Sequence, residues 1–235
     1  MLLSPNDHER IQQAVREAEA RTRGEIVCVV AEEASDYSEV PLIWAAAIAL
    51  AAPSIPLTFA AVVISVRQVF QGWETTPSLG ADSFVIGLAM LASMQFILFV
   101  LVAALAFIPG VRRFLTPQAF KQRFVRQRAF EQFISKGLAG TRERAGVLLY
   151  ASLQDRCAEL IADKGIDDKV EPGAWNKAIS LLVDRIRAGR PVDGFVAAIQ
   201  DCGEHLAKHF PAHPVNPNEL PDSVTELPTR GRRPH

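Results

Sequence analysis

Two long hydrophobic blocks lie in the first half of this 235-residue chain, and they constrain its fold more than any other feature. The first block is Val40–Val66 and the second is Ser83–Ile108. A helix needs about 20 apolar residues to cross the roughly 30 Å hydrocarbon core of a bilayer, and each block exceeds that length. Soluble helices of this length normally keep a polar face. The pattern therefore predicts a two-helix transmembrane hairpin within residues 40–110.

Prolines distinguish the two blocks. Pro53 and Pro56 interrupt the first block, whereas the second has none before its end. A proline inside a helix removes a backbone hydrogen bond and bends or breaks the helix. The first block is therefore either one kinked helix or two shorter ones.

Basic residues are distributed unequally around the blocks. The segment between the blocks contains one basic residue, Arg67, whereas six follow the second block, namely Arg112, Arg113, Lys121, Arg123, Arg126 and Arg128. Basic flanks of membrane helices stay in the cytoplasm. Two crossings return the chain to its starting side, so we expect a protein of the inner or plasma membrane with both termini cytoplasmic. The lipid bilayer is its first expected partner.

The segments that flank the blocks predict a small α/β domain. Glu25–Ala31 is apolar after its first residue and β-branched, which indicates a strand buried on both faces. Gly146–Ser152 and Cys157–Ala162 indicate two more strands, joined by a short hairpin turn. Because a strand buried on both faces needs neighbours, we expect the first two of these strands to pair in one sheet, with Trp175 buried against it.

The remaining segments are expected to be helical or disordered. Thr116–Leu138 has the composition of a helix with its basic residues in the first half. That basic face either lies against anionic lipid or is a solvated helix face beside the membrane. From Pro211 the chain is rich in proline and lacks an apolar period, so we expect a disordered tail.

Charge and cysteine content exclude some classes of function. A net charge of −1 gives no sign of nucleic-acid binding. The three cysteines are far apart in the sequence and form no C-x-x-C pair, which disfavours a redox or zinc motif. Each lies in or beside an apolar run, so we expect buried free thiols.

Some of these segments resemble a known family. The strand–turn–strand sequence GVLLYASLQDRCAELIADKGI and the later GRPVDG, together with the position of the membrane hairpin after the first strand, resemble the TPM domain family. The likeness is to the short bacterial membrane members of that family. It covers about residues 4–40 and 118–211.

The resemblance implies a three-layer α/β sandwich with an inserted two-helix transmembrane hairpin. The domain is expected to be formed by residues 1–39 and 111–211, interrupted by the hairpin at 40–110 and followed by the disordered tail at 212–235. The family also implies a loosely defined activity, because some members are described as acid phosphatases and some bind a divalent cation such as Ca²⁺ or Mg²⁺.

The resemblance also implies site residues. The family's Asp-Arg after an apolar strand falls on Asp155 and Arg156, and its Gly-x-Gly loop falls on 163–165, where Asp163 replaces the first glycine. The acidic position after that loop is matched by Asp167. Asp155, Asp163 and Asp167 are the expected metal ligands, and Asp155 with Arg156 the expected catalytic pair, provided that the two loops meet at one edge of the sheet.

Apart from that resemblance, the sequence contains no recognisable motif of an enzyme. The sequence has no phosphate-binding glycine loop, no H-E-x-x-H and no G-x-S-x-G. His205 and His209 share one helix face, but a pair four residues apart is a weak metal motif without a third ligand. We therefore expect a membrane-anchored binding or accessory domain that acts on a membrane protein partner or forms a homo-oligomer. The alternative is a divalent-metal-dependent phosphatase.

Overall fold

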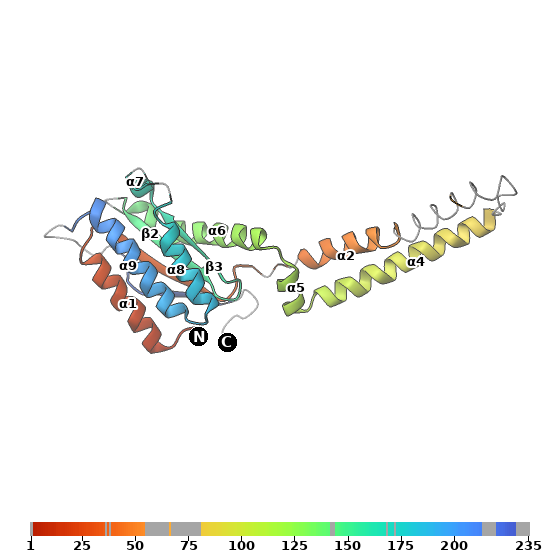
Figure 1. Cartoon of the computed structure of the whole chain (residues 1–235), viewed down its shortest axis with the longest axis horizontal. Helices are drawn as coiled ribbons and strands as arrows, with labels where there is room; N and C mark the ends of the chain where they lie inside the picture. The colour runs from red at the N-terminus through yellow and green to blue at the C-terminus, as the bar shows by residue number, and fades with distance from the viewer. Residues whose placement is uncertain are drawn as a thin grey trace. The chain divides into compact units, whose positions relative to one another are not determined.

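The computed structural model describes residues 2–35, 37, 39–54, 66, 81–141, 144–167, 169–171, 173–212 and 220–228 (Figure 1). The chain divides into two compact units. Unit 1 comprises Met1–Asp36 and Pro117–His235, and unit 2 comprises Tyr37–Thr116. The inserted segment was expected at 40–110, so the compact insert is a few residues longer at both ends.

A four-stranded mixed sheet forms the centre of unit 1, which therefore has an α/β fold. Its strands are β1 (Glu25–Ala31), β2 (Gly146–Ser152), β3 (Cys157–Ala162) and β4 (Thr225–Leu227), in the order β3-β2-β1-β4. β1 runs parallel to β2 and β4, and β2 runs antiparallel to β3. The expected pairing of the first two strands is confirmed, since Glu25 lies opposite Gly146 and Ala31 opposite Ser152.

The strand β4 corrects the expectation of a disordered tail. Thr225–Leu227 pairs with the end of β1, with Val29 opposite Thr225. Glu226 fixes this strand from its side chain, because its carboxylate accepts hydrogen bonds from the backbone N–H groups of Leu2 and Leu3 at 2.9 and 3.0 Å. These contacts join the two ends of the chain and stabilise a segment whose own composition does not favour a strand.

One face of the sheet is covered by three helices, α1 (Pro5–Glu19), α8 (Asn176–Arg187) and α9 (Pro191–His209), which lie side by side in Figure 1. Successive side chains of a strand point to opposite faces, so alternate residues of β1 and β2 meet this layer. The core on this side includes Ile26, Cys28 and Leu149 from the strands with Ile11 and Ile199 from the helices.

The opposite face is covered by α6 (Gln118–Ser135), a helix that was expected within Thr116–Leu138. Its buried residues recur every four positions, at Lys121, Val125, Ala129 and Phe133. The three apolar members of this set pack with the other alternate residues of the sheet, including Val27, Val29, Leu148 and Tyr150. Two short helices complete the unit, η1 (Leu138–Gly140) and α7 (Lys164–Asp167).

Unit 2 contains α2 (Val40–Ala51), α4 (Ala81–Ala106) and α5 (Pro109–Leu115). Within α4, Val85–Ala106 has a mean hydropathy of 2.5, and only its last residue, Ala106, is buried. Among the described residues, one helix, α4, is long and apolar enough to cross a membrane. The first hydrophobic block forms a shorter helix that ends before Pro53, and its continuation from Ile55 to Ser65 lies outside the described residues.

Candidate functional site

Asp155 lies in the tight turn between β2 and β3. The turn is attached to the chain leaving β1, because the N–H of Leu153 donates to the carbonyl of Ala31 at 3.0 Å and the N–H of Gln154 donates to that of Glu32 at 3.1 Å. The carboxyl ends of the two parallel strands are therefore joined at this edge of the sheet. Edges of this kind are the usual ligand sites of α/β folds.

The Asp155 carboxylate is buried, with 2 % of the residue exposed. Its Oδ2 accepts hydrogen bonds from the backbone N–H of Ala34 at 2.9 Å and from the Ser152 hydroxyl at 2.6 Å. Within the described part of the chain its buried Oδ1 has no hydrogen-bond partner. Asp155 thus holds the loop after β1 against the turn, and in this structure its carboxylate is closed to a substrate.

Arg156 differs from Asp155 in exposure and backbone shape. Its φ of +53° places it in the left-handed region that tight turns require and that non-glycine residues rarely adopt. Its side chain is exposed. An exposed guanidinium can bind an anion, but the adjacent carboxylate does not share that exposure, so the two residues do not present a joint catalytic surface.

Two other polar groups near this turn, the Tyr150 hydroxyl and the Cys157 thiol, are held in their neutral forms. The pKa of Tyr150 is raised to about 12, chiefly by burial; Arg128 lowers it, and the nearby Asp155 and Glu131 carboxylates raise it. Burial also raises the pKa of the Cys157 thiol, again with a contribution from Asp155. A thiol becomes a strong nucleophile only when its pKa is lowered. The turn therefore lacks an activated cysteine or tyrosine nucleophile.

The structure places Asp163 at the opposite end of the hairpin from Asp155. In the β2–β3 register Ser152 lies opposite Cys157, beside the turn, whereas Val147 lies opposite Ala162, just before Asp163. A strand of six residues is about 20 Å long at the usual rise per residue. The expectation that the two loops meet at one edge is wrong, because the second strand of an antiparallel hairpin returns the chain to the edge where the first began.

Asp163 has a local structural role of its own. It is buried, and its backbone N–H donates to the carbonyl of Gly146 at 2.8 Å. Two residues later, a Cβ on Gly165 would approach the carbonyl oxygen of Arg144 to 2.6 Å, so this position requires glycine. Close backbone packing thus explains the glycine at position 165.

The expected metal ligands do not form one group of carboxylates. The side chain of Asp167 lies outside the described residues. Among the side chains that the structure describes, no three His, Cys, Asp or Glu residues are close enough to hold a metal ion together. The three cysteines are buried free thiols, as the sequence predicted.

A polar cluster that the sequence analysis missed lies between α8 and α9. Asp201 is 4 % exposed, and its Oδ1 accepts a hydrogen bond from the Lys177 ammonium, which raises the pKa of that lysine. Nε2 of His205 lies 3.9 Å from the other oxygen. Asp201 and His205 are four residues apart in the sequence, a spacing that places both on one helix face.

Trp175 contacts the same cluster. Its ring meets the His205 ring edge-on, with centroids 5.6 Å apart and planes at 69°. The expected burial of this tryptophan against the sheet is only partly right, because its side chain is half-buried and packs at the edge of the helical layer. The cluster connects the start of α8 to α9. None of its described side chains is placed as a free nucleophile.

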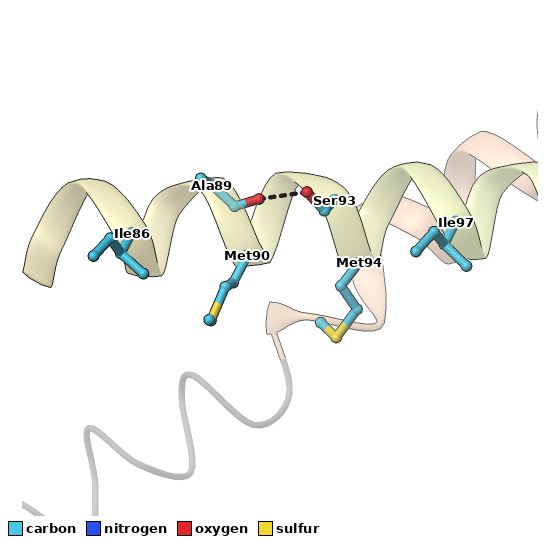
Figure 2. Close-up of a pocket in the computed structure, with 6 residues that line it drawn as sticks. All are labelled: Ile86, Ala89, Met90, Ser93, Met94 and Ile97. Carbon is cyan, nitrogen blue, oxygen red and sulfur yellow. Dashed lines mark hydrogen bonds between the residues drawn. The ribbon is translucent and has the colours of Figure 1, made fainter.

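Surface hollows occur in both units among the described residues. One lies between α1 and α9 and is polar, with a lining of Ala14, Glu17, Arg21, Gln200 and Glu204. The other lies along α4 and is apolar (Figure 2), with a lining of Ile86, Ala89, Met90, Ser93, Met94 and Ile97. In the second, the Ser93 hydroxyl donates to the Ala89 carbonyl at 2.8 Å, so the only polar side chain of the lining is satisfied within its own helix.

Comparisons with known proteins identify a similar fold. No family model matches the chain, and no curated protein matches it. Among solved structures it is similar to the NMR structure of the BA42 protein from the psychrophilic bacterium Bizionia argentinensis, with a TM-score of 0.54 and 18 % sequence identity over 96 % of each chain. At that identity the similarity concerns the fold alone.

Proposed function

We propose that this chain is a membrane-anchored binding or accessory module, in which unit 2 is a transmembrane hairpin that holds the α/β domain at a membrane surface. The observation that carries this proposal is α4, whose 22-residue segment Val85–Ala106 has a mean hydropathy of 2.5 and only its last residue, Ala106, buried. An apolar helix without a protein layer around it is stable in lipid and unfavourable in water.

The proposed orientation places both chain ends in the cytoplasm of an inner or plasma membrane. The six basic residues after the second hydrophobic block support it, against the single Arg67 between the blocks. The α/β domain would then be a cytoplasmic TPM-like three-layer sandwich. Helices on both faces of the sheet support the three-layer arrangement.

The binding interpretation is favoured over the divalent-metal-dependent phosphatase by the geometry of the hairpin. Asp155 is buried and Asp163 lies at the other end of the strands, so the arrangement of ligands on which a metal-dependent reaction was expected is not formed. The candidates that remain are surfaces, and a membrane protein partner or a second copy of the chain would use them.

The anchor can be tested by placing charges at the centre of α4. Met94 and Ile97 are both exposed and lie near the middle of the apolar segment. Each arginine introduced there costs about 2.5–3.5 kcal/mol of membrane insertion free energy. We expect the wild-type chain to stay in the membrane pellet after alkaline carbonate washing, and the double variant Met94→Arg/Ile97→Arg to leave it.

The matched control introduces the same two charges on the exposed surface of α8, as Asn176→Arg/Ser180→Arg, and should pellet like the wild type. Release of the wild-type chain by carbonate would refute the anchor. The accessory interpretation is tested separately by titrating Ca²⁺, Mg²⁺ and Mn²⁺ into the detergent-solubilised chain and measuring phosphate release. Cation-dependent turnover that disappears in Asp155→Asn would establish the phosphatase instead.

A further inference from the structure

The face of α6 that points away from the sheet carries an unusual set of side chains. Residues buried against the sheet lie at 121, 125, 129 and 133. On the opposite side, at spacings of three and four, lie Phe120, Arg123, Gln127, Phe130 and Ile134, which we call the outer stripe. All five are exposed, and the three apolar members are 49 %, 56 % and 54 % exposed.

The outer stripe accounts for the exposed large apolar residues of unit 1. Among the described residues of that unit, Phe120, Phe130 and Ile134 are the large hydrophobic side chains that are exposed. Isolated exposed apolar residues are common on soluble domains, but a confined group on one helix face marks a surface that contacts something apolar.

The charge of α6 complements an anionic surface. The helix contains four basic residues and one acidic residue, a net charge of +3. Arg123 lies within the outer stripe and makes no ion pair or side-chain hydrogen bond that the described residues supply. Arg126 flanks the stripe with a side chain 79 % exposed, and its distance to Glu159 is 3.8 Å. Arg123 is thus available beside the aromatic rings, while Arg126 is engaged in a long, exposed ion pair with Glu159.

Chain connectivity limits how far this helix can lie from a membrane. α6 begins at Gln118, 12 residues after the last residue of α4, Ala106. If α4 crosses the bilayer, the start of α6 lies within reach of the headgroups. A helix with aromatic and aliphatic residues on one face and arginines beside them is the type that lies in the interfacial plane of a bilayer.

We propose that the outer stripe of α6 docks on the cytoplasmic bilayer surface, with its Phe and Ile side chains at the headgroup–acyl boundary and Arg123 on anionic lipid phosphates. This proposal rests on the membrane anchoring proposed above. It adds a second lipid contact that orients the α/β domain, so that the sheet lies behind α6. The other helical layer, with α1, α8 and α9, is then left free for a protein partner.

The test uses the full chain in lipid nanodiscs of phosphatidylcholine, with or without about one third phosphatidylglycerol, an anionic fraction in the range that attracts polybasic segments. A spin label at Gln127→Cys reports on the outer stripe, and a label at Ser180→Cys reports on exposed α8. Collisions with oxygen and with a water-soluble nickel chelate give the depth of each label. The native cysteines are buried and do not compete for the label.

We expect the label at 127 to show fewer collisions with the nickel chelate and more with oxygen than the label at 180, which stays in water. This shift should occur in both lipids and be several-fold larger when anionic lipid is present. Phe120→Ser/Phe130→Ser should reverse this shift in both lipids, and Arg123→Gln should weaken it only in anionic discs. Since all three side chains are exposed, the variants should keep the wild-type melting temperature.

Two results would overturn the proposal while leaving the anchor intact. The first result is that the chain enters the discs but the label at 127 is as accessible to the water-soluble chelate as the label at 180. The other is a label at 127 that is shielded equally in both lipids and shows dipolar coupling to a second label, which would assign the stripe to a second copy of the chain. Failure of the chain to enter the discs would overturn both this proposal and the anchor.

Discussion

At the scale of single residues, the Asp155 carboxylate holds the turn between β2 and β3 against the loop that follows β1. Asp155 was expected to bind a metal or take part in catalysis. Instead, its carboxylate is buried and accepts hydrogen bonds from Ala34 and Ser152. A sequence pattern shows that an Asp-Arg pair follows a strand, but it does not show whether the carboxylate points to solvent or closes a turn.

The structural role of Asp155 predicts a loss of stability on substitution. Asp155→Ala should lower the free energy of unfolding by about 2–4 kcal/mol, because it leaves a buried backbone N–H and a buried hydroxyl without their acceptor. Asp155→Asn keeps one oxygen and should cost less. Chemical denaturation of the detergent-solubilised protein measures both, with the exposed Glu9→Gln as the control that should stay within about 0.5 kcal/mol of the wild type. Unchanged stability in Asp155→Ala would contradict this role.

Glu19, at the end of α1, predicts a pH dependence. Burial raises its pKa from 4.5 to about 8, although its Oε1 accepts a hydrogen bond from the N–H of Ile26 at 2.7 Å. The folded state therefore holds a proton that the unfolded state releases above pH 4.5. The stabilisation linked to that proton is complete below pH 4.5 and is lost as the pH rises toward 8.

Glu19→Gln should remove most of this dependence, since glutamine resembles the protonated acid and cannot ionise. We expect wild-type stability to fall by on the order of 1–2 kcal/mol between about pH 6 and 8, and the variant to stay nearly constant. Thermal melting across this range measures the difference, with Glu9→Gln following the wild-type curve. Parallel curves for the wild type and Glu19→Gln would show that Glu19 is ionised in the folded state.

At the scale of elements, the strands with strong local patterns were predicted at the residues where they occur. β1, β2 and β3 begin and end as expected, because their runs of buried apolar residues are bounded by polar or glycine residues. The pairing of β1 with β2 also followed from burial on both faces. The prediction that the loops after β2 and after β3 lie at the same edge of the sheet was wrong. Asp155 and Asp163 are therefore at opposite ends of the hairpin.

The strand β4 could not be predicted from its own sequence. Its three residues are held by contacts with distant segments, such as the hydrogen bond of 2.7 Å from the Lys136 ammonium to the Thr225 hydroxyl. Arg16 on α1 pairs with Asp222 just before the strand at 3.2 Å. The strand propensity of a short segment does not include contacts with residues distant in the sequence. The cluster around Asp201 was missed for the same reason, since Lys177 lies 24 positions away in the sequence.

At the scale of the whole molecule, unit 1 is built from two chain segments separated by unit 2. The two segments meet close to the point of insertion, because Arg128 Nε donates to the carbonyl of Ala34 at 3.2 Å. Arg128 lies ten residues into α6 from Gln118, which corresponds to about 15 Å along a helix. A flexible chain of about ten Gly and Ser residues has an average span of about 16–19 Å.

Replacing Tyr37–Thr116 with such a linker should therefore leave unit 1 folded and make it water-soluble. The core on both faces of the sheet is supplied by residues of unit 1, and the exposed apolar surface of α4 is removed with unit 2. We expect a cooperative melting transition and protected amides in β1 and β2 by hydrogen exchange. The same protein carrying Asp155→Ala should melt at a lower temperature, since that carboxylate lies within unit 1. A product that aggregates or exchanges its β1 amides at the rate of an unfolded chain would show that unit 2 is needed to bring the two halves of the sheet together.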